Sequence, residues 1–593
     1  MKILILATFL ILPLCATIDA RSHIASAKQS QRSKADQKRE SSITGRLVAE
    51  SGQPIPNAII YVRRAGKLRD NSRSTSTDDE GRFRVNDLAR GVYRVSPNAP
   101  GYVLTDEQAG WLIYRAGDTA NIKMSKGGVI TGTVTNSSGE PVIAMTVHAI
   151  QVKEKDGRAI SSGKPDTGDA TTDDRGVYRL YGLTSGSYLI IVSGRNRYSN
   201  EPNPYENDMP VYYPSSTRDT AMPVTLRVGE EMTGIDIRYR DEPGHAISGN
   251  VVGGPTEDSL APGVGISLNL IHVSSNLIEA TVQASQRRSG RPFDIYGVPD
   301  GEYYINTQLY DYGGKGAIAT GRARVKVKGA DVTGLEITLL PLGSITGTIT
   351  IYAARETIKC EVQQRISLDE TIIKAHQDEK ENRNETPLAI WDRLQTVPTD
   401  KGEFTINSVE AGRYRMEYNF IGEDWYVRSV TLPSPVPAKP AIDVARNGFA
   451  VKQGERVAGL NITLAEGAAG IKGKVVSATE SARLPDRLRV HLVPAEKVSA
   501  NDVLRFAEVM AQSDGSFSIS NLAPGRYWII ALPATDDNSS ARPQPTAWDS
   551  NDRAALRNAA EAANVVLELQ ACQRVVDYSL KYAPTSPATK KTE

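Results

Sequence analysis

The sequence is poor in the residues and motifs that build most catalytic sites. Its 593 residues include only six histidines and three cysteines. It contains no Gly-x-Ser-x-Gly segment, which excludes the nucleophile turn of α/β-hydrolases. Gly313-Gly314-Lys315 is followed by Gly316, where a phosphate-binding loop needs serine or threonine, so we predict no such loop.

Charge of one sign and long apolar runs are also scarce. A net charge of +1 argues against binding to nucleic acid or to an anionic membrane. One apolar run, Ile3–Cys15, follows Lys2 and precedes small residues, which predicts a signal peptide. Ala16 and Ala20 are the candidate cleavage points, and we take residues 1–20 as the signal peptide. No other run is long enough to span a bilayer. We therefore expect a protein exported to the periplasm, the cell surface or the medium. We also expect it to be a monomer.

One motif is present five times at fixed internal spacing. It reads aromatic-x-aliphatic, two residues, Leu or Val, two residues, and then Gly-x-Tyr-x-aliphatic. The copies are Phe83, Val85, Leu88, Gly91, Tyr93 and Val95; Tyr178, Leu180, Leu183, Gly186, Tyr188 and Ile190; Phe293, Ile295, Val298, Gly301, Tyr303 and Ile305; Phe404, Ile406, Val409, Gly412, Tyr414 and Met416; and Phe517, Ile519, Leu522, Gly525, Tyr527 and Ile529.

We expect this motif to form a β-hairpin. Phe83 and Val85 alternate with arginines, the period-two pattern of a strand with one buried face. The following residues turn the chain, and Gly91 supplies a position that favours a positive φ angle. The ring of Tyr93 is then buried while its hydroxyl bonds a nearby backbone group, as in the tyrosine corner of immunoglobulin-type sandwiches. The motif thus predicts core and turn, not binding.

Two further phrases recur. The first opens each unit as Ile-x-Gly-x-aliphatic and predicts a strand whose glycine marks a bulge or a close backbone approach. Its glycines are Gly45, Gly132, Gly249, Gly347 and Gly473. The second phrase closes three units and contains Thr233-Gly234-Ile235, Thr333-Gly334-Leu335 and Ala458-Gly459-Leu460.

The first unit resembles a known family over its whole length. The resemblance rests on Gly45, Gly52-x-Pro54-Ile55, Thr77-Asp78-Asp79-x-Gly81-x-Phe83, Leu88, Gly91, Tyr93 and Pro100-Gly101-Tyr102. This pattern is similar to the carboxypeptidase regulatory-like domain, and the other four units depart from it in places. The resemblance implies a transthyretin-like, seven-stranded β-sandwich close to starch-binding-like folds. It implies no catalysis, because that domain is the non-catalytic companion of a zinc carboxypeptidase.

The predicted fold is therefore all-β, with five tandem transthyretin-like or immunoglobulin-like seven-stranded β-sandwich domains after the signal peptide. Units of about 100 residues are long enough for cores of their own. The predicted divisions are 1–20 signal peptide, 21–42 disordered polar linker, 43–125 (unit 1), 126–242 (unit 2), 243–341 (unit 3), 342–466 (unit 4), 467–582 (unit 5) and 583–593 disordered tail.

Unit 4 contains a charged insertion, residues 355–396. A helix over Leu368–Lys380 is considered there, although its apolar spacing is weak. His376 and Glu379 have the spacing of the His-x-x-Glu pair of zinc carboxypeptidases. A zinc site needs a third protein ligand, and the only later histidine is His491. We therefore predict no metal, no other cofactor and no catalytic residue.

Signal-peptide cleavage would leave two cysteines in the mature chain. Cys360 lies in unit 4 and Cys572 in unit 5. An exported protein is in a compartment that permits a disulfide between them, and the sequence alone does not decide whether it forms.

Aromatic residues outside the motif are the candidate ligand-binding residues. Sugar-binding sandwiches stack pyranose rings on exposed Trp and Tyr. Trp528 is next to motif residue Tyr527 and so is expected to point to the opposite face, toward solvent or a neighbouring unit. Loop anchoring and packing between domains are the competing interpretation of all these residues. The candidates are Trp111, Tyr114, Tyr212, Tyr213, Trp425, Tyr426 and Trp528.

Three functions compete. The first is a non-catalytic secreted scaffold that binds surfaces or proteins, with strand addition at sandwich edges as one mode. The second is carbohydrate binding through exposed aromatics, which the similarity to starch-binding-like folds implies. The third is an enzyme or an accessory to a peptidase. The expected partner is a polysaccharide or a surface protein.

Overall fold

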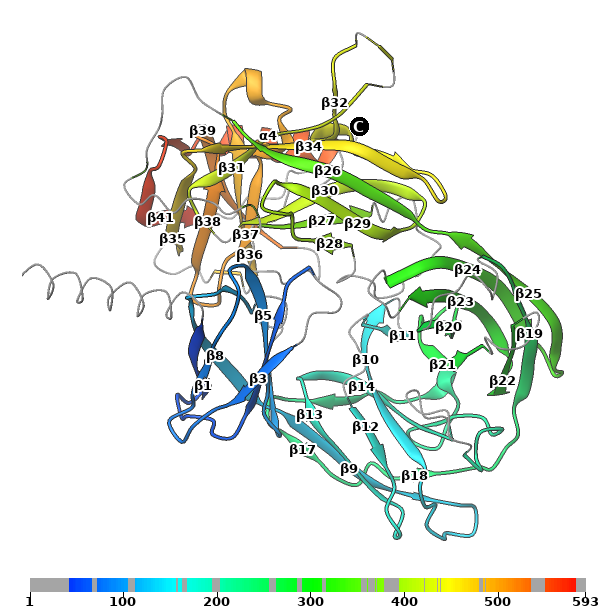
Figure 1. Cartoon of the computed structure of the whole chain (residues 1–593). Coiled ribbons are helices and arrows are strands. Elements are labelled where there is room, and N and C mark those ends of the chain that lie inside the picture. The colour runs from blue at the N-terminus through cyan, green and yellow to red at the C-terminus, as the bar shows by residue number, and fades with distance from the viewer. Residues whose placement is uncertain are drawn as a thin grey trace, which may run out of the picture.

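The structure is a computed structural model, and it is almost entirely β. It describes residues 42–582 except 67–71, 105–111, 156–157, 163–167, 195–202, 255–262, 285–290, 312–315, 353–359, 361–367, 369–370, 378–393, 421, 435, 438, 479–483, 486 and 535–549. The predicted signal peptide, linker and tail thus lie outside the described residues, apart from Ser42 at the end of the linker. Figure 1 shows repeated β-sandwiches that follow one another along a curved path.

Unit 1 is a sandwich of two four-stranded sheets. The first strand of the unit lies beside the last one in parallel, and the strand that carries Phe83 lies on its other side. The first sheet has the order β4(Arg82–Val85), β1(Ile43–Ala49), β8(Thr119–Lys126), β6(Tyr102–Val103), and the second has the order β3(Arg73–Ser76), β2(Ile59–Arg64), β5(Val92–Asn98), β7(Ile113–Arg115).

Units 2 and 3 repeat this plan with local changes. In unit 3 one strand, β24(Gly316–Val327), pairs with both β23(Gly301–Asp311) and β25(Val332–Pro341), so that a single seven-stranded sheet wraps around the core. Unit 2 contains β9(Gly128–Thr135), β10(Thr146–Lys155), β11(Arg158–Ser161), β12(Gly168–Thr171), β13(Val177–Leu183), β14(Gly186–Ser193), β15(Val211–Tyr212), η1(Arg218–Thr220), β16(Val224–Leu226), β17(Glu231–Met232) and β18(Ile237–Arg238); unit 3 contains β19(His245–Gly253), β20(Val264–His272), β21(Ile278–Gln283), β22(Pro292–Val298), β23(Gly301–Asp311), β24(Gly316–Val327) and β25(Val332–Pro341).

Units 4 and 5 add short helices to the sandwich. Unit 4 contains β26(Gly343–Ile351), β27(Thr371–Gln377), β28(Gln395–Thr396), β29(Glu403–Val409), β30(Gly412–Phe420), β31(Trp425–Leu432), β32(Ile442–Asp443), α3(Val444–Asn447), β33(Phe449–Val451) and β34(Arg456–Glu466). Unit 5 contains β35(Ala469–Ser477), β36(Leu488–Pro494), η4(Lys497–Ser499), η5(Val503–Arg505), β37(Ala507–Met510), β38(Ser516–Leu522), β39(Gly525–Pro533), α4(Ser550–Ala563), β40(Val566–Leu569) and β41(Arg574–Tyr582).

The prediction of a hairpin for the repeated motif is wrong. In unit 1, β4 pairs with β1 and β5 pairs with β2, so the motif crosses from one sheet of the sandwich to the other. Phe83 and Tyr93 are both buried because each faces the space between the sheets. Alternation along each strand is the same for a hairpin and for this crossing, which is why the sequence pattern did not separate them.

The tyrosine corner is confirmed in all five units. Each motif tyrosine donates its hydroxyl to the carbonyl of the residue four positions earlier and so closes the crossing between the sheets. The five bonds run from Tyr93 to Ala89 at 2.7 Å, Tyr188 to Thr184 at 2.7 Å, Tyr303 to Pro299 at 2.9 Å, Tyr414 to Glu410 at 3.0 Å and Tyr527 to Ala523 at 2.6 Å.

The glycine of the opening phrase marks a close backbone approach, as predicted. A Cβ atom on Gly45 would lie 2.1 Å from the carbonyl oxygen of Ala120 on the neighbouring strand. The same clash, at 1.9 to 2.2 Å, recurs in each later unit, with the last strand in units 3, 4 and 5 and with the segment just before β18 in unit 2. It involves Gly132 with Ile235, Gly249 with Leu335, Gly347 with Leu460 and Gly473 with Tyr578.

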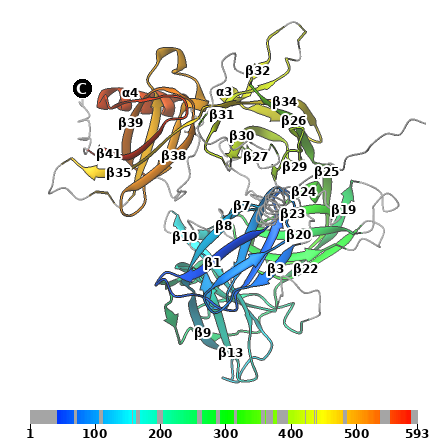
Figure 2. The same cartoon turned by 60° about the vertical axis from the view of Figure 1, so that its left-hand side comes forward.

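Each predicted unit contains its own hydrophobic core, and further contacts join the units. Ile150 and Ile191 of unit 2 form a smaller apolar cluster with Leu277 of unit 3. Unit 1 also lies against unit 4. The evidence is the close approach of Gly66 to Val397: a Cβ atom on Gly66 would lie 2.7 Å from the backbone nitrogen of Val397. Figure 2 shows the same succession of units from another side.

The helix considered within the unit 4 insertion does not form where it is described. Residues Thr371–Gln377 are strand β27, which pairs with β30. Ile372, Ile373 and Ala375 are buried, and strand pairing satisfies their backbone while Ile373 and Ala375 enter the unit 4 core. The weak helical spacing of the apolar residues agrees with this outcome.

Candidate functional site

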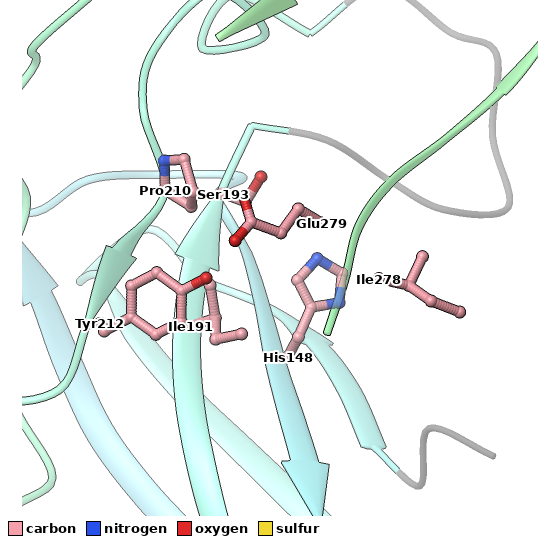
Figure 3. A pocket seen from close by; sticks show the side chains of 7 residues that line it. All are labelled: His148, Ile191, Ser193, Pro210, Tyr212, Ile278 and Glu279. Atoms are coloured by element: carbon pink, nitrogen blue, oxygen red, sulfur yellow. The ribbon is translucent and has the colours of Figure 1, made fainter. Parts of the chain in front are cut away.

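A small pocket lies at the junction of units 2 and 3. Its volume is about 320 Å³, including open solvent at its mouth. Figure 3 shows its polar side chains on β10, β14, β15 and β21 turned toward one another. The lining residues are His148, Ile191, Ser193, Pro210, Tyr212, Ile278 and Glu279.

A buried ion pair crosses this junction. Nη1 of Arg218, which lies on η1 of unit 2, is 2.5 Å from Oε1 of Glu279, which lies on β21 of unit 3. Their side chains are 9% and 2% exposed. The same guanidinium lies above the ring of Tyr303, 6.0 Å from its centre. A pair removed from water to this extent holds its geometry tightly, because separating it would leave a buried charge.

The two histidines of the junction are also bonded. His148 Nδ1 lies 2.7 Å from Asp169 Oδ1, and His272 Nδ1 lies 2.8 Å from the Ser275 hydroxyl. Burial, together with the positive charge of Arg218, lowers the pKa of His272 to about 4. His272 is therefore neutral at neutral pH and packs edge-on against the ring of Tyr303 at 5.5 Å. Each of these two bonds lies within one unit and fixes a histidine at the junction, and neither pairs a nucleophile with an aligned base.

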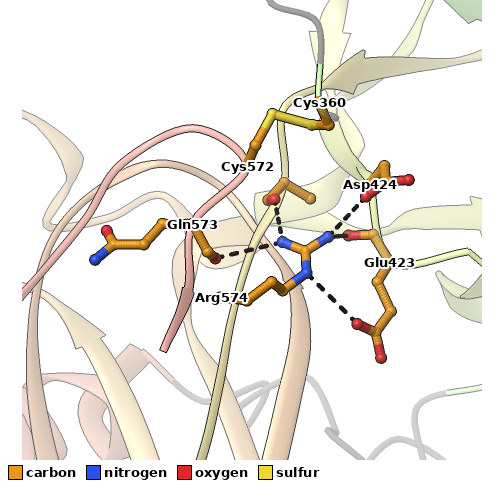
Figure 4. The surroundings of a disulfide bond; sticks show 7 residues. Cys360, Glu423, Asp424, Cys572, Gln573 and Arg574 are labelled. Carbon is orange, nitrogen blue, oxygen red and sulfur yellow. Dashed lines mark hydrogen bonds and ion pairs between the residues drawn. A yellow bond between two sulfur atoms is a disulfide. The ribbon is translucent and has the colours of Figure 1, made fainter. Parts of the chain in front are cut away.

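The junction of units 4 and 5 contains a disulfide. Cys360 and Cys572 are bonded, with their Cα atoms 5.4 Å apart, which settles the pairing that the sequence left open. Arg574 lies beside this bond (Figure 4). Its Nη2 donates to the carbonyl of Glu423 and to Oδ1 of Asp424, each at 2.8 Å, and its Nη1 donates to the carbonyl of Ala468 at 2.6 Å.

The motif corner supplies further bonds between units. Asn521 Nδ2 donates to the carbonyls of Gly422 and Trp425 in unit 4, at 2.7 and 2.8 Å. Ser408 Oγ, at the same motif position in unit 4, donates to the carbonyl of Ala317 in unit 3 at 2.5 Å. This position has a positive φ angle in every unit, at Asp87, Gly182, Gly297, Ser408 and Asn521.

The sequence pattern did not predict that this position of the motif makes contacts between units. The motif template treats the residue before its Leu or Val as variable, and that residue is Asp87, Gly182, Gly297, Ser408 or Asn521. Gly, Asn, Asp and Ser are the residue types that favour left-handed or turn backbone, so the signal was available.

Most of the predicted ligand-binding aromatics pack into the protein. Tyr212 and Trp425 are buried, at 2% and 8% exposure. Tyr114 and Tyr213 are half-buried against the cores of units 1 and 2, and Tyr426 is half-buried on β31. Trp111 lies outside the described residues.

The expectation that Trp528 faces solvent or another unit is wrong. Trp528 is 8% exposed, because helix α4 of its own unit packs on that face of the sheet with Ala560 and Leu556. The guanidinium of Arg557 on α4 lies 4.8 Å from the indole ring centre. The tyrosines that are exposed in the described part of the chain are others: Tyr61, Tyr181, Tyr296 and Tyr352, at 40%, 61%, 39% and 42% exposure.

The histidine residues give no metal centre within the described part of the chain. No group of three or more His, Cys, Asp or Glu side chains is placed there to hold an ion. His376 lies on β27, Glu379 is not described, and His491 lies in unit 5, with its Nδ1 3.1 Å from Glu508 Oε2. In the same part of the chain, no helix is long and apolar enough to cross a membrane.

Comparison with known proteins supports the resemblance for one unit. Residues 42–125 match the model of the carboxypeptidase regulatory-like domain, which covers unit 1 and does not extend to the other four. No curated protein matches the chain.

Comparison with solved structures gives matches of low similarity, several of them to bacterial pilins. The chain is 14% identical to the Bacillus anthracis TIE protein, with 50% of each chain covered and a TM-score of 0.13. It thus spans half the length of that protein. It is 13% identical to the minor pilin GBS52 of Streptococcus agalactiae, over 34% of this chain and 97% of the pilin, with a TM-score of 0.18. A streptococcal ancillary pilin is 14% identical over 51% of this chain and 99% of its own, with a TM-score of 0.16.

Proposed function

We propose that the chain is a non-catalytic, exported scaffold whose five β-sandwich domains hold one another in fixed positions and bind a partner on their outer surfaces. The proposed domains are residues 43–125, 126–242, 243–341, 342–466 and 467–582. The partner class is a surface protein or a polysaccharide. Export rests on the apolar run that begins at Ile3.

The observation that carries this proposal is the chemistry of the junctions. Polar side chains at the unit boundaries donate to groups of the neighbouring unit, as Arg574 and Asn521 do between units 4 and 5. Arg218 of unit 2 likewise donates to the Glu279 carboxylate of unit 3. Domains joined by linkers alone move relative to one another, whereas buried, bonded interfaces restrict that motion. The polar side chains at these junctions thus stabilise the arrangement of the units.

Small-angle X-ray scattering of the full mature chain tests this scaffold. We expect the wild-type profile to match the compact, curved arrangement and to stay unchanged with ionic strength. With a thiol reductant to open the bond between Cys360 and Cys572, Arg574→Ala combined with Asn521→Ala should increase the radius of gyration while circular dichroism still shows folded β-structure. A wild-type profile that requires an ensemble of extended arrangements would refute a fixed scaffold.

Carbohydrate binding is the second candidate, now with other residues than the sequence suggested. Tyr181 and Tyr296 stand at equivalent motif positions in units 2 and 3, and both are exposed. Exposed tyrosines with polar neighbours such as Arg179 and Asp294 can stack on sugar rings. Retention of the full chain on an insoluble polysaccharide, lost in Tyr181→Ala and Tyr296→Ala but kept in Tyr61→Ala, would support this function. Retention that none of the three variants changes would count against it.

A further inference from the structure

Unit 1 carries a group of cations on the outer face of its first sheet. Strands β4, β1 and β8 lie side by side in this sheet, and β1 and β8 are labelled in Figure 1. Leu47, Phe83 and Ile122 are buried, so the residues next to them in the strands point away from the core. The exposed cations there, which we call the basic face, are Arg46, Arg82, Arg84 and Lys123.

Two of these arginines stand directly opposite each other. Arg46 on β1 pairs with Arg82 on β4 in antiparallel register. Like charges at such positions destabilise the pairing of two strands. Within the described residues, one ion pair reaches the basic face, from Arg82 Nη1 to Glu80 Oε2 at 3.8 Å. Its side chains are 67% and 58% exposed, so water and salt weaken it, and the face keeps an excess of positive charge.

The arginines are oriented so that their terminal nitrogens stay available. Arg46 Nε donates to the carbonyl of Glu80 at 2.9 Å, and Arg84 Nε donates to Oδ1 of Asn86 at 2.7 Å. The terminal nitrogens of Arg46 and Arg84 make no hydrogen bond within the described part of the chain. These nitrogens are the donors with which arginine binds carboxylates.

The sandwich does not need this pair of charges, because the other units carry different residues at the same register. The positions of Arg46 and Arg82 are occupied by Thr133 and Val177 in unit 2, Asn250 and Pro292 in unit 3, Thr348 and Glu403 in unit 4, and Lys474 and Ser516 in unit 5. Among these described pairs, unit 1 alone places two cations opposite each other. Charges that weaken strand pairing and that the fold does not require point to a role in binding.

We propose that the basic face binds an acidic polysaccharide through the carboxylate groups of its sugars. Each cation is exposed, so a single contact is weak, and a polymer that makes several contacts at once binds more tightly. Thr44 lies opposite Arg84, and Asn121 lies beside Arg46, so hydroxyl and amide groups are available for the sugar hydroxyls. Single-stranded nucleic acid is bound with aromatic side chains that stack on bases, and the exposed residues of β1, β4 and β8 include none.

This inference rests on the proposed binding of a partner by the outer surfaces, and it names the class of polysaccharide. The fixed arrangement of the five units does not depend on it, and X-ray scattering tests that arrangement separately. Variants of Tyr181 and Tyr296, in units 2 and 3, test sugar stacking and leave the basic face unchanged.

Retention of the full mature chain on immobilised polygalacturonate tests the basic face. Polygalacturonate carries a carboxylate on each sugar, and its methyl ester is the same chain without the charge. Wild type should be retained on polygalacturonate, be released by salt and pass through the methyl ester unretained. Retention on both polymers, on neither, or equally on single-stranded DNA would overturn the proposal.

Exchanging two arginines for the residues of unit 2 locates the binding. Arg46→Thr combined with Arg82→Val should lose most of the retention on polygalacturonate. The matched control is Lys472→Thr combined with Lys474→Thr, which removes two exposed positive charges from the opening strand of unit 5. This control should be retained like wild type. Equal losses in the two double variants would show a general effect of charge and would overturn the site.

Amide hydrogen exchange of β1 and β4 gives a readout that needs no variant. Bound carboxylates offset the repulsion between Arg46 and Arg82, so polygalacturonate should slow exchange in these strands of wild type, and its methyl ester should not. Without polymer, Arg46→Thr combined with Arg82→Val should exchange there as slowly as wild type or more slowly. Faster exchange in this variant would mean that the arginines support the fold, and would count against a role in binding.

Discussion

Ser408 and Asn521 stand at the same position of the repeated motif, and each donates a hydrogen bond to the unit before its own. Ser408 bonds the carbonyl of Ala317, and Asn521 bonds the carbonyls of Gly422 and Trp425. Both residues have positive φ angles, 62° and 59°. The corner that carries the chain between the two sheets is thus also a joint between successive units.

Asn521→Asp should weaken the joint between units 4 and 5. A carboxylate cannot donate, so the carbonyls of Gly422 and Trp425 would face an anion in place of an amide. We expect a loss of about 1–3 kcal/mol in the free energy of unfolding, measured by denaturant titration. Aspartate tolerates the positive φ angle, so backbone strain does not confuse the result. The matched control is Asp87→Asn at the same motif position in unit 1, which should change the unfolding free energy by less than about 0.5 kcal/mol.

Tyr414→Phe should isolate the contribution of one tyrosine corner. The variant keeps the buried ring and removes the hydroxyl that donates to the Glu410 carbonyl at 3.0 Å. A net loss of about 0.5–1.5 kcal/mol in unfolding free energy is expected for one such bond. A loss near zero would mean that the closure of the sandwich depends on the ring alone.

The buried ion pair between units 2 and 3 should respond differently to single and double replacement. Arg218→Met leaves the Glu279 carboxylate buried at 2% exposure, and we expect a loss of about 3–5 kcal/mol in stability. Adding Glu279→Leu removes the uncompensated charge and should restore most of that loss. Equal stabilities of the single and double variants would show that the pair is not desolvated.

Acid should destabilise the junction of units 2 and 3 through His272. Its pKa is 6.5 in its ordinary state and about 4 in the folded protein, mainly because it is buried. Between these values the unfolded chain binds a proton that the folded chain does not, so stability is complete above pH 6.5 and is lost as the pH falls toward 4. The slope should not exceed about 1.4 kcal/mol per pH unit. Thermal unfolding of wild type and of His272→Gln between pH 7 and 4 measures it, and the variant should lack this part of the slope.

Reduction of the disulfide should leave units 4 and 5 associated. Arg574 and Asn521 hold unit 4 independently of the bond between Cys360 and Cys572. With a thiol reductant, X-ray scattering of wild type should stay near the oxidised profile, whereas Arg574→Ala should expand only when reduced. An expanded wild-type protein after reduction would mean that the disulfide alone keeps units 4 and 5 associated.

Much of the fold was predictable because the repeat fixes local geometry. The tyrosine corner and the clash-limited glycine at Gly45 follow from residue type and spacing, and both are confirmed. The hairpin was wrong because alternation in a strand does not say which sheet the strand joins. The prediction for Trp528 was wrong for a similar reason. Alternation places Trp528 on the face opposite Tyr527, but it does not show that helix α4, about 20 residues later in the sequence, covers that face.

The junctions could not be predicted, because they depend on contacts between residues far apart in the chain. Arg218 meets Glu279 and Arg574 meets Asp424 only after the units have packed. Nothing local distinguishes these arginines from solvated ones. The two cysteines of an exported chain allow only one internal pairing, but the sequence alone left open whether that bond forms.

The disulfide also changes the effect of cleaving one peptide bond of this chain. Cys360 and Cys572 are separated by 212 positions, so the chain between them forms a covalent ring. A single peptide-bond cleavage anywhere in that ring opens it without separating the two ends. On a denaturing, non-reducing gel the cleaved molecule would keep its full mass, and only added thiol would release the fragments.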